Sequence, residues 1–160
     1  MTQNQRIRLR REELGLLDTD VANRIGISIA AYGDIEAYAD ELFDVVELRT
    51  VRALCAVLNL DVLDLIGTEC EICSGRGNFS EELKLPRNVL VQNRRSVRGL
   101  SRAELAEAIG FEEVAIRQME SDPSFLDGWS VNLIKELSVL LDTPFQLLAD
   151  VRCSKCRAPA

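Results

Sequence analysis

Two Cys-x-x-Cys pairs constrain this chain more than any other feature of its sequence. The first pair is Cys70 and Cys73, the second is Cys153 and Cys156, and most of one half of the chain lies between them. One such pair supplies two thiolates, which is half of a tetrahedral metal site, whereas two pairs supply all four ligands. We therefore expect a fold that brings the two pairs together around one shared metal ion.

The thiol pairs belong to an internal repeat. Residues 11–36 match residues 95–120 at an offset of 84, and the apolar positions of 51–58 match those of 134–141 at an offset of 83. The offset of 83 also carries Cys70 onto Cys153 and Cys73 onto Cys156. Two equivalent units that pack about a pseudo-two-fold axis would place the two pairs next to each other, so the sequence predicts an internal pseudo-dimer.

Each unit has the pattern of about five short helices, and the expected fold class is all-α. The expected helices span 3–14, 18–25, 28–37, 45–58 and 61–66 in the first unit, and 87–98, 102–109, 112–120, 129–141 and 144–149 in the second. Ser101 and Glu104 form a capping-box pattern, and glycines stand where helices are expected to end. The expected organisation is a unit at 1–67, a thiol pair and linker at 68–85, a second unit at 86–150, and a thiol pair and tail at 151–160.

Each unit resembles the Cro/repressor-type (XRE-like, lambda-repressor-like) helix-turn-helix family. The first copy carries Arg11-x3-Gly15-x6-Ala22-x2-Ile25-Gly26-Ile27-Ser28-x6-Ile35-Glu36, and the second runs from Arg95 to Glu120. The resemblance implies a compact five-helix domain for each unit. It also implies structural ion pairs of Arg11 with Glu36 and of Arg95 with Glu120. The third helix of each unit would be the recognition helix of a DNA-binding transcriptional regulator.

The third helices differ in what they offer to DNA. The first has no Arg, Lys, Asn or Gln to read base edges, whereas the second has Arg117 and Gln118. Arg94, Arg98 and Arg102 are candidates for phosphate contacts beside it. The first hypothesis is a regulator that binds double-stranded DNA mainly through the second unit. Because the net charge is −7, an alternative is an adaptor or antagonist that binds a regulatory protein without contacting DNA, and a second alternative is a thiol or metal redox sensor.

The metal site is expected to be structural zinc. The chain contains no histidine, so the ligands must be thiolates or carboxylates, and four thiolates leave no open position for catalysis. A single iron in a rubredoxin-like site uses the same ligands and stays an alternative, as do two redox disulfides. Cys55 has no counterpart in the second unit, where Ser138 takes its place, and is expected to be a core residue.

Other function classes are not expected. The sequence contains no glycine-rich phosphate loop, no nucleophile elbow and no histidine base, so we expect neither an enzyme nor a small-molecule substrate. It also contains no apolar run long enough for a membrane span and no signal-peptide pattern, so a cytoplasmic protein without a membrane partner is expected. Whether the internal pseudo-dimer forms a further homo-oligomer stays open.

Overall fold

The computed structural model of the chain describes residues 1–75 and 77–157. Within them the regular structure is helical, without a β-strand and with an isolated antiparallel bridge between Glu47 and Ser130. The all-α class predicted from the sequence is therefore confirmed. None of the helices in this part of the chain combines the length and the apolar character that a membrane span requires.

The helices of the first half recur in the second half. The first half contains α1 (Gln3–Glu13), α2 (Asp18–Ile25), α3 (Ile29–Ala37), α4 (Glu41–Asp44), α5 (Leu48–Leu58) and α6 (Val62–Leu65), and the 3₁₀ helix η1 (Glu82–Lys84) follows. The second half contains α7 (Arg87–Val97), α8 (Arg102–Ile109), α9 (Glu113–Ser121), the 3₁₀ helix η2 (Phe125–Gly128), α10 (Val131–Leu140) and α11 (Phe145–Ala149), and α12 (Ser154–Arg157) lies in the tail. The first residues of α1, α2 and α3 recur at the offset of 84 as those of α7, α8 and α9, and the first residues of α5 and α6 recur at the offset of 83 as those of α10 and α11. The offsets read from the sequence are thus also offsets between helices.

Local sequence signals mark several helix ends as expected. Ser101 Oγ accepts a hydrogen bond from the Glu104 amide, and the Glu104 carboxylate accepts one from the Ser101 amide, which completes the capping box before α8. Gly26 and Gly110 end α2 and α8 with φ angles of 75° and 74°. This left-handed conformation suits glycine because it has no Cβ.

The predicted helices 45–58 and 129–141 are too long at their N-terminal ends. In the first half the short helix α4 and an extended residue precede α5, and in the second half the 3₁₀ helix η2 and an extended residue precede α10. The extended residues are Glu47 (ψ 145°) and Ser130 (ψ 159°), which form the isolated bridge. Ser130 is also the N-cap of α10, since its Oγ accepts from the Leu133 amide. This junction, α12 and the 3₁₀ turns were not foreseen, because tertiary contacts determine them.

The two halves meet through this bridge. Glu47 pairs with Ser130, which is its own equivalent at the offset of 83, and the Leu48 amide donates to the Trp129 carbonyl over 2.8 Å. Helix α4 contacts α10, and α5 contacts η2. Leu48 and Val131, at the starts of α5 and α10, are fully buried. The halves therefore share one core across a junction of equivalent segments.

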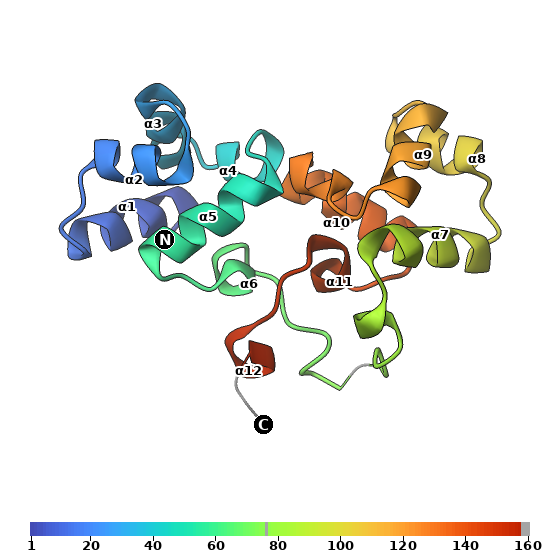
Figure 1. The fold of residues 1–160 in the computed structure, drawn as a ribbon. Helices are drawn as coiled ribbons and strands as arrows, with labels where there is room; N and C mark the ends of the chain where they lie inside the picture. The colour runs from blue at the N-terminus through green and yellow to red at the C-terminus, as the bar shows by residue number, and fades with distance from the viewer. Residues whose placement is uncertain (76, 158–160) are drawn as a thin grey trace.

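An ionic cluster beside the junction also links the halves. Asp127 of η2 accepts hydrogen bonds from Arg52 of α5 and from Arg87 of α7, the latter over 2.8 Å. Arg52 donates in addition to the Ala149 carbonyl at the end of α11. Figure 1 shows the resulting arrangement: α3 and α9 lie at the two ends of one side, α5 and α10 lie between them, and α12 lies on the opposite side.

Candidate metal centre

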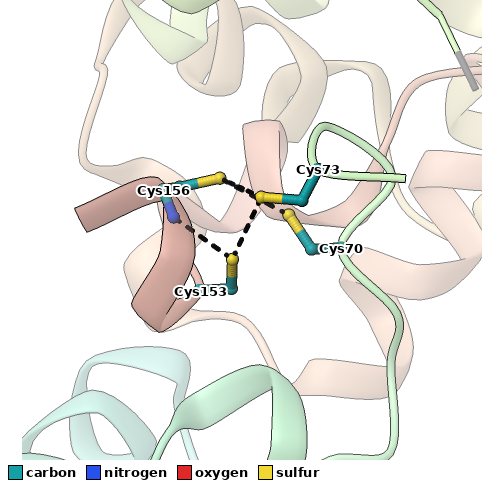
Figure 2. Close-up of side chains that lie close together, drawn as sticks. All are labelled: Cys70, Cys73, Cys153 and Cys156. Atoms are coloured by element: carbon teal, nitrogen blue, oxygen red, sulfur yellow. Dashed lines mark hydrogen bonds between the residues drawn. The ribbon is translucent and has the colours of Figure 1, made fainter. Parts of the chain in front are cut away.

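The two thiol pairs meet because the segment that carries each pair contacts the opposite half of the chain. Cys70 and Cys73 lie in a turn after α6, while Cys153 precedes α12 and Cys156 lies within it. The first pair touches the second half, since the Gln146 side-chain amide of α11 lies 3.7 Å from Cys70 Sγ as a donor. The second pair touches the first half, where the Ser154 amide donates to Asp61 over 3.1 Å. Figure 2 shows the four side chains pointing toward one another.

The four sulfur atoms have the spacing of a metal site. Cys73 Sγ lies 2.9 Å from Cys156 Sγ and 3.4 Å from Cys153 Sγ, Cys70 Sγ lies 3.7 Å from Cys156 Sγ, and all four are within 4.8 Å of one another. A tetrahedron with metal–sulfur bonds of about 2.3 Å has edges of about 3.8 Å. A disulfide would need about 2.05 Å, and all of these thiols are free. The cluster predicted from the sequence is therefore present and could hold a metal ion.

Charge explains why this cluster suits a cation. Burial acts to raise the pKa of Cys153, but donors to its sulfur, the Cys156 amide at 3.4 Å first among them, lower that pKa to about 7. The pKa of Cys156 is raised instead, chiefly by its hydrogen bond with Cys73. The sulfurs therefore differ in how readily they ionise, and four thiolates this close would repel one another. A divalent cation removes that repulsion and binds the deprotonated sulfurs.

Cys55 does not belong to the cluster. It is 2 % exposed in the core of α5, as the sequence predicted, and burial raises the pKa of its thiol to about 12. The sulfur of Cys55 therefore packs as an apolar group, and a variant of Cys55 can serve as the control for variants of the four clustered cysteines.

Both arginine–glutamate pairs implied by the family resemblance are formed. Arg11 binds Glu36 with two hydrogen bonds of 2.6 and 3.0 Å, and the Tyr32 hydroxyl donates to the same carboxylate over 2.6 Å. Arg95 binds Glu120 in the second half. These pairs join α1 to α3 and α7 to α9. Tyr32 is fully buried and belongs to the core.

The candidate DNA-binding residues lie at two different places. Arg94 and Arg98 donate to backbone carbonyls at the C-terminal end of α10. Arg102 donates to Glu120 over 2.7 Å, so it extends the ion pair between α7 and α9. Arg117 and Gln118 are exposed on α9, and Arg117 forms an ion pair of 2.9 Å with Glu113. Four of the five candidates thus have partners within the chain.

Sequence reasoning missed the residues that support the thiol pairs. Gln146 is 2 % exposed and lies among the apolar residues of α11. One polar residue inside such a short apolar helix was the available signal, since buried polar groups normally have a specific partner. Asp61 caps α6 by accepting a hydrogen bond from the Asp64 amide, and its second oxygen accepts one from the Ser154 amide of the tail.

The sequence and the structure were compared with known proteins. No protein-family model, no curated protein and no solved structure matches the chain. The family resemblance therefore stays a prediction that rests on the motif residues.

Proposed function

We propose that the chain is a tandem of two Cro/repressor-type helix-turn-helix units, residues 1–67 and 86–150, held together by one metal ion. Three features support this architecture. The helices recur at constant offsets, a left-handed glycine separates α2 from α3 and α8 from α9, and an arginine–glutamate pair joins the first and third helices of each unit. The segments that carry the thiols, 68–85 and 151–160, then form a shared attachment. Residue 76 and residues 158–160 of these segments lie outside the described residues.

Structural zinc is the proposed metal. Four thiolates close the tetrahedron, so no ligand position is left for water or a substrate. A single iron would use the same ligands, and metal analysis of the purified protein separates the two. Because each thiol pair contacts the opposite half of the chain, the ion would fix the linker and the tail across the junction.

The proposed partner is a positively charged protein surface, and the charge of the α3–α9 side carries this proposal. Residues 17–44, which contain α2 to α4, have one arginine against seven carboxylates, of which Glu36 is bound to an arginine of α1. Residues 101–128, which contain α8 to η2, have two arginines against seven carboxylates, and five of these remain when Glu120 and Asp127, which are bound to arginines, are left out. In helix-turn-helix repressors the corresponding segments approach the DNA. Phosphates would meet mainly negative charge here, whereas a basic protein surface would be attracted. We therefore propose an adaptor or antagonist that binds a protein.

Exposed apolar side chains lie on or directly after the same segments. Ile29 of α3 is 50 % exposed, Val45 after α4 is 65 % exposed, and Val114 of α9 is 55 % exposed. A protein partner could bury these side chains and remove their apolar surface from water. They do not favour binding to phosphates.

Titrations with labelled duplex DNA and with a labelled basic peptide, each at about 50 and about 200 mM salt, test the proposed partner. We expect the peptide to bind more tightly at low salt and the duplex not to bind even there, since phosphate contacts strengthen as salt is removed. The variant Asp18→Lys/Asp34→Lys, with both changes at exposed positions on α2 and α3, should weaken peptide binding. The variant Glu12→Lys/Glu13→Lys on α1 is the matched control. Binding of the wild-type protein to duplex DNA with a steep salt dependence would overturn the proposal.

Direct DNA binding through the second unit is the second candidate function. The observation in its favour is that Arg117 and Gln118 are exposed on α9. It requires Arg117 to leave Glu113 for a base edge, where a bidentate contact is worth about 1–3 kcal/mol. If the duplex binds, Arg117→Ala/Gln118→Ala should abolish the sequence preference. An unchanged preference in that variant would assign the binding to another surface.

A further inference from the structure

A pocket of about 440 Å³ opens beside the third helix of the first half. Ile27 before α3, Ala31 and Ile35 of α3, and Val46 before α5 form its apolar wall, and Glu41 and Glu47 lie at its charged edge. Its volume is within the range of pockets that bind a small ligand or a buried side chain, about 300–1,000 Å³.

The second half shows what the same place contains when it is filled. The position equivalent to Ile27 is Phe111, and the position equivalent to Val46 is Trp129. The rings of Phe111 and Trp129 are stacked with their centroids 4.8 Å apart and their planes at 17°, and Trp129 is only 7 % exposed. The other apolar wall positions keep similar residues, Ala31 being equivalent to Ala115 and Ile35 to Met119. The pocket is therefore associated with the exchange of two aromatic residues for two smaller aliphatic ones.

The rim of the pocket selects for positive charge. Glu41 and Glu47 line it together with Arg49, whose guanidinium forms an ion pair of 2.8 Å with Glu47. Asp40 and Asp44 are exposed on either side of Glu41. Two carboxylates and one arginine that is already paired line the pocket, and two further carboxylates are exposed nearby in the sequence, so the surroundings of the opening attract a cationic group.

We infer that this pocket receives an aromatic side chain from a cationic segment of a partner protein. The inference rests on the proposed function and names the feature of the basic partner that is recognised. The incoming ring would take the place that the Phe111–Trp129 stack has in the second half, and basic residues beside it would meet the acidic rim. A buried aromatic side chain removes a large apolar area from water, and an aliphatic wall of this kind gives it an apolar surface to pack against.

Fluorescence anisotropy with two labelled peptides, KKWKK and KKAKK, tests the inference. We expect the tryptophan peptide to bind the full-length protein about ten-fold more tightly than the alanine peptide, which corresponds to about 1.4 kcal/mol. The variant Ile27→Phe/Val46→Trp copies the filled pocket of the second half and should remove this preference. The variant Val139→Trp adds an aromatic residue at a position on α10 that is 77 % exposed and should leave the preference unchanged.

Two further measurements keep the outcome decisive. Thermal melting shows whether the double variant folds, and Ala31→Met, which blocks the pocket with a residue that favours helix, replaces it if it does not. Equal binding of both peptides to the wild-type protein would overturn the pocket inference while the acidic recognition surface stands. Binding of neither peptide at about 50 mM salt would overturn the proposed basic partner as well.

Discussion

Replacing Cys73 by serine is the most direct perturbation of the metal centre. Cys73 is exposed, so the substitution removes a ligand without removing a buried side chain. Structural zinc sites in small domains bind with an apparent free energy of about 10–16 kcal/mol at neutral pH. An equal share for each of the four thiolates is about 3 kcal/mol, and the loss of one ligand should raise the Kd roughly a hundred-fold.

Competition with a chromophoric chelator measures this change in Kd, and metal analysis gives the stoichiometry. The wild-type protein should bind one ion for each chain, and Cys73→Ser should bind it about a hundred-fold more weakly. Cys55→Ala is the matched control, because it also removes a thiol but lies in the core of α5 away from the cluster. An unchanged Kd for Cys73→Ser, or two ions for each wild-type chain, would refute the shared four-thiolate site.

Removal of the metal should not separate the two halves. The bridge between Glu47 and Ser130, the contact of α4 with α10 and the Asp127 cluster all join the halves without the thiols. Chelation is therefore expected to increase amide exchange in residues 68–74 and 151–157, while α5 and α10 stay protected. Full exchange in α5 and α10 after chelation would show that the metal alone holds the halves together.

Two ionic contacts provide further predictions. Asp127→Ala should lower the free energy of unfolding by about 2–3 kcal/mol and Tm by roughly 5–10 °C, since Arg52 and Arg87 both lose their carboxylate partner. Urea unfolding checks this against Asp150→Asn, which removes a more exposed carboxylate 4.0 Å from Arg52 and keeps a side chain that tolerates the left-handed conformation of residue 150. Equal losses in the two variants would contradict the argument. Burial acts to raise the pKa of Glu120, but hydrogen bonds from Arg95 and Arg102 outweigh it and hold the pKa below its ordinary value. The ionised Glu120 therefore stabilises the folded state above the unfolded-state pKa, and this contribution is lost as pH falls through the folded-state pKa. Glu120→Gln should therefore show a smaller loss of stability than wild type between about pH 5 and pH 3, and identical acid dependence of the two proteins would show that this carboxylate is not responsible.

Local chemistry explains why most helix ends could be predicted. Gly26 and Gly110 end helices because the chain needs a left-handed residue there, and Ser101 starts one because its hydroxyl binds a free amide. Both signals act within a few residues along the chain. Glu47 carries no such signal. Ser130 does cap α10 with its hydroxyl, but the bridge that Glu47 and Ser130 form across the junction depends on the tertiary structure.

The candidate metal site likewise has residues that the sequence predicts and supporting contacts that only the tertiary structure shows. The thiol spacing and its recurrence at an offset of 83 were sufficient to predict that Cys70, Cys73, Cys153 and Cys156 would cluster. The support from Gln146 and Asp61 was not predictable, because each contact joins a segment of one half to a segment of the other. The partners of Arg94, Arg98 and Arg102 were likewise hidden, since the sequence shows three cations but not the carbonyls and the carboxylate that they face.

The sequence by itself determined the all-α class, the repeat, and the four thiols that meet. These follow from spacing and from short-range preferences that every helix expresses locally. Only the tertiary structure decided how the halves are joined, which arginines are already bound, and where a pocket is left. Each of these depends on which surfaces come together in the folded chain. The aliphatic residues Ile27 and Val46 line a pocket at the place where the equivalent residues Phe111 and Trp129 stack, and this difference is visible only in the structure.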